Sequence, residues 1–337
     1  MRVLMVAPPW IPVPPPAYGG TEAVIDSLTR ALLRLGHEVV LFTTGDSTID
    51  CPKQWHFAKS LGLPDDQLGP ELAHVISSRE FALNWHADVI HDHSLVGAVM
   101  SSSLPLVVTN HGPFDDVSNI IFERASRNAA VVAISKSQAN FAAPTVRITD
   151  VIHHGIDIED FPVGDGSGKY LAFVGRMNPD KGVREAIQIA WAAKVPLHIA
   201  AKMREKEEVH YFEREIRPLL GGDIQYLGEL DGQSRNALLC GASALLNPIN
   251  WDEPFGMVML ESLACGTPVI TTTRGAAPEI VEDGITGLLA DSFDELTKAV
   301  FAISDIDRNQ CRRSASLGFS AERMAADYAS LYASIAS

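Results

Sequence analysis

Residues 250–270 read NWDEPFGMVMLESLACGTPVI and hold the most informative pattern in the sequence. Two carboxylates, Glu253 and Glu261, are separated by seven residues. The apolar run between them predicts a short helix that begins near Phe255 and ends at Gly266. A helix N-terminus offers unpaired N–H groups and the positive end of a dipole, which suit a diphosphate. With a diphosphate bound there, Glu261, further along the helix, can reach a ribose, and Glu253, just before the helix, can reach a sugar. The plain alternative is a buried helix with one capping and one solvated glutamate.

Short apolar runs alternate with helical periodicity along the rest of the chain. Such alternation predicts parallel sheets that are covered by helices on both faces. In the first half we expect strands at Val3–Ala7, Glu38–Thr43, Val89–His91, Leu106–Thr109 and Val131–Ile134, helices at Glu22–Leu35 and Glu71–Trp85, and an irregular segment from Asp46 to Pro70.

Residues 161–168 are rich in Gly and Pro and are interpreted as a linker between two domains. We predict an α/β protein with two doubly wound, Rossmann-like domains, 1–162 and 163–320, that face each other across a cleft, and a C-terminal helix in 321–337. In the second half we expect strands at Tyr170–Val174, Leu197–Ala201, Ile224–Leu227, Ala244–Leu246 and Val269–Thr272, and helices at Val183–Ala192, Val209–Leu220, Gln233–Cys240, Phe293–Ile303, Arg308–Leu317 and Ala321–Ile335.

Two further segments carry groups that suit a diphosphate. Arg176 and Lys181 follow the first predicted strand of the second domain, and a forked guanidinium and a point charge can converge there on one anion. Gly19 and Gly20 let the backbone approach a ligand closely, and Thr21 is a candidate cap for the next helix. The alternatives are a solvated loop and an ordinary turn. The sequence has no G-x-G-x-x-G pattern, which argues against a dinucleotide enzyme.

Histidines follow two of the predicted buried strands. His111 comes just after Leu106–Thr109, and its imidazole can donate or accept a hydrogen bond near neutral pH, although it could also cap the next helix. His91 and His93 flank an aspartate in a pattern that could indicate a metal. Because adjacent residues on a strand point to opposite sides and no further ligands gather nearby, we expect a structural or acceptor-side role and no metal site.

Taken in order, these motifs resemble those of the retaining glycosyltransferases of family 4, which have the two-domain B-type fold (GT-B). The resemblance covers nearly the whole chain and includes the Glu-x7-Glu pair, the Gly-Arg-x4-Lys-Gly element of Arg176 and Lys181, and the Gly-Gly loop. In that family a histidine followed by glycine hydrogen-bonds the donor sugar, which implies this role for His111. The family's final helix crosses back to the first domain, which implies the same for residues 321–337.

Some elements depart from the family pattern. Residues 151–157 read VIHHGID where the family usually has Pro-Asn-Gly-(Val/Ile)-Asp, so His153 and His154 replace a Pro-Asn pair and leave its contact in doubt. Residues 274–279 read RGAAPE and resemble Gly-Gly-x-Pro-Glu with one glycine changed to alanine. Gly228-Glu229-Leu230 follows a strand and is expected to line the pocket for the base.

The charge and the cysteine content of the chain indicate which kinds of binding partner and cellular compartment to expect. The formal net charge is −15, with 27 basic and 42 acidic residues and no basic run, which argues against nucleic acid and against strong adhesion to anionic lipid. The four cysteines are far apart and form no CxxC pair, as expected for reduced thiols. The N-terminal apolar run is short for a signal sequence, and no stretch approaches about 18 apolar residues. We therefore expect a cytoplasmic protein, with membrane association not favoured.

The resemblance implies a hexosyltransferase that moves a sugar from a nucleotide-sugar donor to a hydroxyl acceptor, for instance a small molecule. UDP is the most frequent donor nucleotide in such families. Front-face attack is implied, with the acceptor hydroxyl giving its proton to the departing phosphate, and no cofactor or metal is expected. The implied catalytic residues are His111, Glu253, Arg176 and Lys181, and the implied donor-binding residues are Gly19, Gly20, Arg176, Lys181, Phe255, Gly256, Met257, Val258 and Glu261.

Three alternatives stay open. A nucleotide-sugar 2-epimerase of the same architecture would need acids that exchange protons with the sugar ring. An inactive nucleotide-sugar-binding protein would not need the intact pairs Arg176/Lys181 and Glu253/Glu261. A peripheral membrane enzyme with a lipid acceptor is disfavoured by the acidic charge and by the lack of a basic amphipathic helix.

Overall fold

The computed structural model describes residues 1–62 and 67–336 and divides the chain into two compact units. The first unit comprises Met1–Ile156 and the C-terminal residues from Ser320 onward, and the second comprises Asp157–Phe319. The sequence had placed the domain boundaries after residues 162 and 320. Residues 63–66 of the segment predicted to be irregular, and the last residue of the range 321–337, lie outside the described residues.

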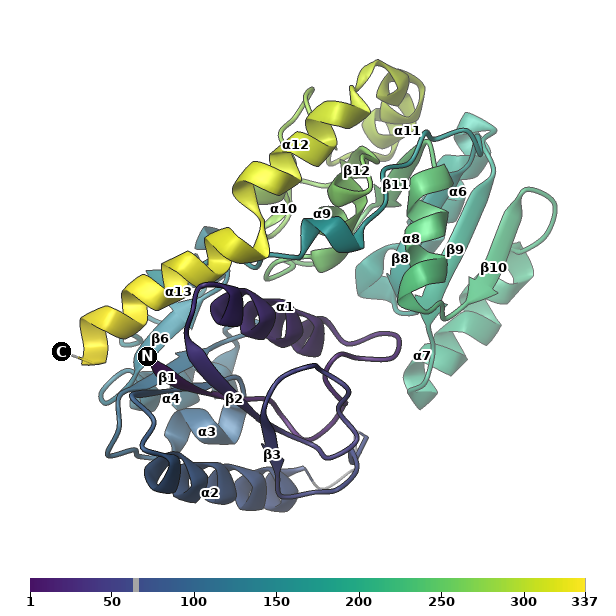
Figure 1. Ribbon diagram of the computed structural model, residues 1–337. Helices are drawn as coiled ribbons and strands as arrows, with labels where there is room; N and C mark the ends of the chain where they lie inside the picture. The colour runs from purple at the N-terminus through teal and green to yellow at the C-terminus, as the bar shows by residue number, and fades with distance from the viewer. Residues whose placement is uncertain (63–66, 337) are drawn as a thin grey trace. The chain divides into compact units, whose positions relative to one another are not determined.

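A parallel sheet of seven strands forms the centre of the first unit, in the order β3-β2-β1-β4-β5-β6-β7 (Figure 1). All of the strands predicted for this half are present. The sequence missed the two edge strands, β3 and β7, because both are short and partly exposed and so lack a continuous apolar run. Since β3 lies within residues 46–70, the prediction of an irregular segment there is wrong in part. The strands are β1 Arg2–Val6, β2 Glu38–Thr43, β3 Lys53–Trp55, β4 Val89–Asp92, β5 Leu106–Thr109, β6 Ala130–Ala133 and β7 Ile148–Val151.

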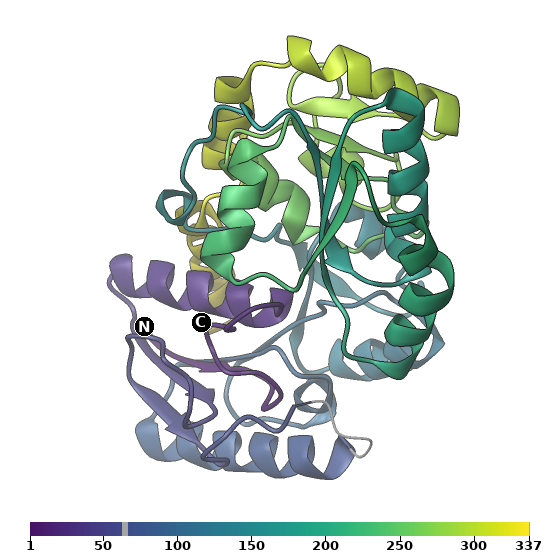
Figure 2. The ribbon, with the colours of Figure 1, turned by 90° about the vertical axis from the view of Figure 1, so that its right-hand side faces the viewer.

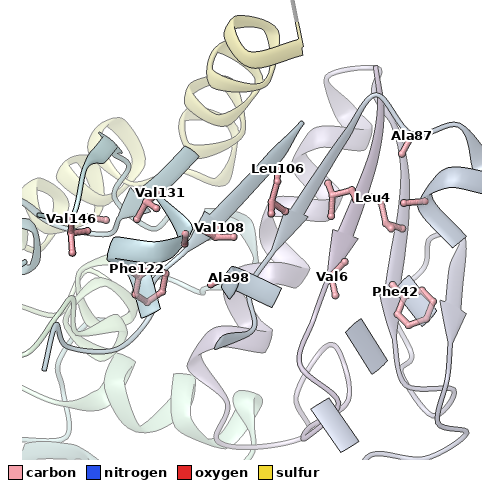
Figure 3. Packing of buried hydrophobic residues seen from close by; sticks show 14 of the residues in the cluster. Leu4, Val6, Phe42, Ala87, Ala98, Leu106, Val108, Phe122, Val131 and Val146 are labelled. Atoms are coloured by element: carbon pink, nitrogen blue, oxygen red, sulfur yellow. The ribbon is translucent and has the colours of Figure 1, made fainter. Parts of the chain in front are cut away.

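Helices cover both faces of this sheet. On β1, Leu4 and Val6 point into an apolar cluster that Phe122 of α4 helps to fill (Figure 3). Because side chains alternate along a strand, Val3 and Met5 point to the opposite face, where α1 and α13 pack against each other (Figure 1). The helices of the unit are α1 Gly20–Arg34, α2 Leu68–Trp85, α3 Leu95–Val99, α4 Asp116–Ala125, α5 Lys136–Asn140 and α13 Ala321–Ala336.

The second unit repeats this architecture with a parallel sheet of six strands, in the order β10-β9-β8-β11-β12-β13. Helices again flank the sheet on both sides, with α8 and α9 packed together on one face and α6 and α11 on the other (Figure 2). Its strands are β8 Leu171–Arg176, β9 Leu197–Lys202, β10 Ile224–Gly228, β11 Ala244–Asn247, β12 Val269–Thr271 and β13 Gly287–Leu289. Its helices are α6 Val183–Ala193, α7 Lys206–Tyr211, α8 Gly232–Gly241, α9 Met257–Ala264, α10 Ala277–Ile280, α11 Phe293–Ala302 and α12 Arg308–Gly318.

Two predictions for this unit need correction. The single helix expected at residues 209–220 is instead α7, a wider turn at Phe212–Ile216 and a tight 3-10 turn at Arg217–Leu219. Pro218 explains the break, because it has no N–H to donate and so cannot continue the hydrogen bonding of an α-helix. The sequence also missed α10 and β13, which are both short.

The strand order of each sheet reverses at one place. The reversal falls between β1 and β4 in the first unit and between β8 and β11 in the second. Doubly wound sheets bind ligands at the carboxyl ends of the strands beside such a switch point. The loops that follow β8 and β11 are therefore the natural place to look for a ligand site in the second unit.

Candidate active site

The loop after β8 carries the two predicted cations. Arg176 is the last residue of the strand, and its Nε is buried and has no hydrogen-bond partner among the described residues. Asn178 caps the 3-10 turn that follows, its Oδ1 accepting from the N–H of Lys181 at 3.2 Å. The tight turn therefore returns the Lys181 ammonium toward the end of the sheet at which Arg176 lies.

Gly182 joins this loop to the one that follows β11. Its φ is +74°, and a Cβ at this position would lie 1.9 Å from the carbonyl oxygen of Pro248. The N–H of Asn250 also donates to the carbonyl of Asp180 at 2.8 Å. The two loops thus pack backbone against backbone, which only glycine permits at this point.

Glu253 lies at the centre of the loop that follows β11. Its Oε2 forms an ion pair with Nζ of Lys181 and accepts from Nε1–H of Trp251 at 2.8 Å. The side chains of Lys181 and Glu253 are 13% and 14% exposed, so the pair is largely shielded from water. The ring of Trp251 also lies 5.4 Å from Nζ of Lys181. Glu253 is therefore the counter-anion of Lys181.

Gly256 leads this loop into α9. Its φ of +98° turns the chain so that the helix begins at Met257, two residues later than predicted, with no side-chain cap. The ring of Phe255 is buried and lies 6.3 Å from the ring of Phe319, so a ligand would meet the backbone of Phe255 rather than its side chain. The N–H groups of the first helical turn, which includes Met257 and Val258, are those that a helix N-terminus offers to an anion.

Glu261 is buried one turn further along α9. Its Oε2 lies 3.1 Å from Nε of Arg235 on α8, a partner that the sequence gave no reason to select. Burial raises the pKa of Glu261, and the positive charge of Arg235 offsets part of that rise. The expected role of Glu261 in binding ribose stays a prediction, and the structure adds that Arg235 holds this carboxylate.

The glycine pair precedes α1 in the first unit. The helix begins at Gly20 with Gly19 as its N-cap residue and no side-chain cap, so the prediction that Thr21 caps it is wrong. A Cβ on Gly19 would lie 2.7 Å from Cβ of Pro15, whereas one on Gly20 would meet no described atom within 4 Å. Gly19 is thus required by packing inside its own loop, and Gly20 is the one that leaves open space.

Glu22 lies next to this loop and was not singled out in the sequence. Its side chain is buried, and burial raises its pKa to about 7, although a hydrogen bond from its own backbone N–H acts in the opposite direction. The desolvation of the carboxylate therefore outweighs the favourable position of an acid in the first turn of a helix.

Four histidines gather at the carboxyl ends of β4 and β5. His111 Nε2 lies 2.8 Å from Nδ1 of His93, and its ring stacks on His154 with 5.1 Å between the ring centres. His91 contacts the hydroxyl groups of Tyr332 at 2.7 Å and Thr109 at 2.8 Å. Burial lowers the pKa of His111 to about 4 and holds those of His91, His93 and His154 well below their usual range.

Asp92, between His91 and His93, points the other way. Its Oδ2 pairs with Nη2 of Arg79 at 2.8 Å, and the rings of His91 and His93 lie 4.1 Å apart on the opposite side of the strand. Within residues 1–62 and 67–336, no group of three or more His, Cys, Asp or Glu side chains is placed to hold a metal ion.

In the same part of the chain no helix is long and apolar enough to cross a membrane.

The predicted residues thus fall into two groups. At the carboxyl ends of β8 and β11 the structure brings together Arg176, Lys181, Glu253, Gly256, Met257, Val258 and Glu261. Gly19, Gly20 and His111 belong to the first unit. Arg235 and Trp251, which the sequence reasoning missed, hold the two glutamates. Arg235 lies on a different helix from Glu261 and has no local sequence signal, whereas Trp251 stands two residues before Glu253, and its place inside the motif could have pointed to it.

Two family models match most of the chain. Glycosyltransferase Family 4 matches residues 18–160, and Glycosyl transferases group 1 matches residues 168–305. The chain belongs to glycosyltransferase family 4. This glycosyltransferase is 25% identical over 348 residues to glycogen synthase of Mycobacterium tuberculosis, with 86% of this chain and 82% of the relative covered. It is 24% identical over 342 residues to phosphatidyl-myo-inositol mannosyltransferase of Mycolicibacterium smegmatis, with 91% and 86% covered.

Solved structures show that this glycosyltransferase has the B-type fold. Sucrose-phosphate synthase from Thermosynechococcus elongatus superposes with a TM-score of 0.81 at 19% identity, covering 99% of this chain and 98% of that one. Anabaena Alr3699/HepE, solved in complex with UDP-glucose, superposes with a TM-score of 0.76 at 19% identity, covering 99% and 100%. The chain therefore has two Rossmann-like domains.

Proposed function

We propose that this enzyme is a retaining glycosyltransferase that moves a sugar from a nucleotide-sugar donor, a UDP-sugar, to a hydroxyl acceptor. The observation that carries the proposal is the group of anion-binding elements at the β8/β11 switch point. There, Arg176 has a buried Nε without a partner among the described residues, the described contacts of the Lys181 ammonium are a carboxylate and an indole ring, and α9 begins just after Gly256. These three elements suit the diphosphate of a donor.

The leaving group sets the electrostatic task. When the bond between sugar and phosphate breaks, negative charge develops on the nucleoside diphosphate. Arg176, Lys181 and the first-turn N–H groups of α9 would stabilise that charge from fixed positions, which is the largest contribution such a site can make. Because these cations carry the neutralising charge, we propose that the reaction needs no metal ion.

The sugar and the acceptor complete the proposed reaction. Glu253 would bind hydroxyls of the sugar, and Glu261 would bind the ribose. The acceptor oxygen attacks the anomeric carbon on the face from which the diphosphate departs, its proton passes to the departing phosphate oxygen, and the configuration is retained. His111 would bind the sugar without acting as a nucleophile, so positioning and charge stabilisation would supply the rate enhancement.

We propose a hydroxyl group of a small molecule as the acceptor. The segment around residues 46–70 is short, which suggests a trimmed acceptor domain, and such a domain is compatible with a small acceptor. One structural relative, AviGT4, is described as involved in Avilamycin A biosynthesis, and it is 24% identical with 99% of this chain covered. A lipid acceptor is the second candidate, because a curated relative is a phosphatidyl-myo-inositol mannosyltransferase. Transfer to soluble alcohols in the absence of vesicles supports the first class, and transfer only to vesicles that contain phosphatidylinositol supports the second.

A thermal-shift panel of UDP, GDP, ADP and dTDP, each with and without a sugar, tests the donor assignment. A nucleotide that binds the folded chain raises Tm with the logarithm of its concentration above Kd. Lys181→Ala and Glu261→Ala should each weaken this shift, whereas His111→Ala should keep it and lower the rate of transfer. Unchanged nucleotide affinity in both of the first two variants would refute the site.

Incubation with the donor alone separates transfer from epimerisation. A transferase hydrolyses the donor at most slowly, while a 2-epimerase converts it to its epimer. The related proteins do not favour the epimerase, since those described above are synthases and a mannosyltransferase. Nucleotide binding without turnover across a panel of donors and acceptors would instead indicate an inactive binding protein.

A further inference from the structure

Three side chains of the first unit form a chain of contacts that ends at His111. Met5 lies on β1, His93 follows β4, and His111 follows β5. The Sδ of Met5 lies 2.9 Å from Nε2 of His93, and Nδ1 of His93 lies 2.8 Å from Nε2 of His111. Met5 and His93 are buried and His111 is half-buried. The chemistry of the Met5 sulfur indicates which nitrogen of each histidine carries a proton.

A thioether sulfur has lone pairs and no proton, so it can only accept. A hydrogen bond between these two atoms therefore requires that Nε2 of His93 carry the proton and donate to the sulfur. In a neutral imidazole the other nitrogen has none, so Nδ1 of His93 accepts and Nε2–H of His111 donates to it. This leaves Nδ1 of His111 without a proton, and the hydrogen bond that His111 forms among the described residues is made by its Nε2.

The opposite arrangement requires either a charged ring or the loss of the hydrogen bond to Met5, because a neutral ring protonated at Nδ1 turns the Nε2 lone pair toward the lone pairs of the sulfur. If Nδ1 of His93 donated to His111 while Nε2 still donated to Met5, His93 would be an imidazolium. Burial and the neighbouring rings of His91, His111 and His154 lower the pKa of His93 well below its usual range, so the neutral form prevails near pH 7. Burial likewise lowers the pKa of His111 to about 4.

We propose that Met5 and His93 are positioning residues that hold His111 as its Nε2–H tautomer, so that Nδ1 accepts a hydrogen bond from a hydroxyl of the donor sugar. The use of this nitrogen rests on the proposed function, whereas the tautomer itself does not. His111 then acts as an acceptor at neutral pH and cannot donate to a phosphate or ring oxygen from Nδ1.

Long-range 1H–15N correlation spectra of the full chain with 15N-labelled histidine test the tautomer directly. The signals of His111 and His93 are assigned by their loss in His111→Gln and His93→Gln. Both rings should show a pyrrole-type Nε2 and a pyridine-type Nδ1 near pH 7. A pyrrole-type Nδ1 on His111, or a doubly protonated ring, would overturn the proposal without any further variant.

Met5→Leu tests the origin of the preference, because it keeps the side-chain volume and removes the sulfur acceptor. The signals of His93 and His111 should change to those of mixed tautomers, and kcat for transfer should fall about two- to fivefold, as expected for a weak hydrogen bond, with the Kd for the nucleoside diphosphate unchanged. Leu4→Met is the matched control, because it lies on the same strand and points to the other face. This control should leave the histidine signals and kcat unaltered.

The outcomes separate the two proposals. A single unchanged tautomer in folded Met5→Leu would exclude Met5 as its cause, and mixed tautomers with an unchanged kcat would show that the tautomer is not used. Should no nucleotide sugar support transfer, the proposed function fails, while the spectra still decide the tautomer. If Met5→Leu does not fold, His93→Gln tests whether His93 sets the tautomer of His111, because an amide can rotate to donate or to accept. An unchanged, single tautomer of His111 in that variant would overturn the proposal.

Discussion

The ion pair between Lys181 and Glu253 leads to a prediction with opposite signs for its two members. Both groups would be expected to help bind the donor, yet Glu253 is itself the anion beside Lys181. A diphosphate must compete with that carboxylate for the ammonium. Lys181→Met should therefore weaken binding of the nucleoside diphosphate, and Glu253→Gln should leave it unchanged or strengthen it.

The magnitudes follow from the surroundings of the pair. Losing one charged hydrogen bond to a diphosphate costs about 1.5–3 kcal/mol, or roughly a 10- to 100-fold rise in Kd for Lys181→Met. The free energy of unfolding is affected as well. Breaking a surface ion pair costs about 0–1 kcal/mol, and breaking a buried one costs about 3–5 kcal/mol. The side chains of Lys181 and Glu253 are 13% and 14% exposed, so we expect a cost between these two limits. We expect a loss of about 2 kcal/mol for Lys181→Met. Glu253→Gln should lower the free energy of unfolding by less, because the amide oxygen of the glutamine can still accept a hydrogen bond from Nε1–H of Trp251.

Isothermal titration with the nucleoside diphosphate and denaturant unfolding of the two single variants and the double variant give the full cycle. The double variant should lose less stability than the sum of the singles, because it leaves no charge unpaired. Arg184→Met is the control, since Arg184 is 50% exposed in its pair with Glu215 and should cost under about 1 kcal/mol. If Glu253→Gln weakens diphosphate binding as much as Lys181→Met, the competition argument is refuted.

Three other features give predictions. Gly182→Ala should cost more than about 3 kcal/mol in denaturant unfolding, because its Cβ would overlap a carbonyl, whereas Gly284→Ala, with a φ of +75° and open space, should cost about 1–2 kcal/mol. Arg235→Ala should destabilise the chain by about 2–4 kcal/mol and weaken nucleotide binding by leaving Glu261 buried and unpaired, with partial recovery in Arg235→Lys. Glu22→Gln should raise Tm at pH 8 and change it little at pH 4.5, because a folded pKa of about 7 makes the acid's contribution fall as pH rises from about 4.5 through 7.

Each of these has an outcome that contradicts it. Equal losses for the two glycine variants would mean that the Gly182 backbone moves freely. A stable Arg235→Ala with full nucleotide affinity would remove Arg235 from the site. A Tm difference for Glu22→Gln that does not vary between pH 4.5 and 8 would mean that Glu22 has the same pKa in the folded and unfolded chain.

The sequence determined the parts of this protein that depend on local patterns. Buried parallel strands read as apolar runs such as the one at Val3–Ala7, and Gly36 ends the first amphipathic helix, so the alternating architecture was predictable. The Glu-x7-Glu spacing and the Arg176/Lys181 element also placed their residues after strands. The missed edge strands and the broken helix at residues 206–219 lacked a local signal or were interrupted by proline.

Only the tertiary structure decided which groups meet. Lys181 and Glu253 lie 72 residues apart in sequence, and Met5 and His93 lie 88 apart, so no local periodicity could pair them. Their contacts exist because parallel strands bring their carboxyl ends to one edge of the sheet, whatever the sequence separation. The protonation of the histidines likewise depends on burial and on neighbours from other strands, since desolvation is a property of the packed chain. Residue types set which chemistry is available, and the fold sets which charges and protons each group holds.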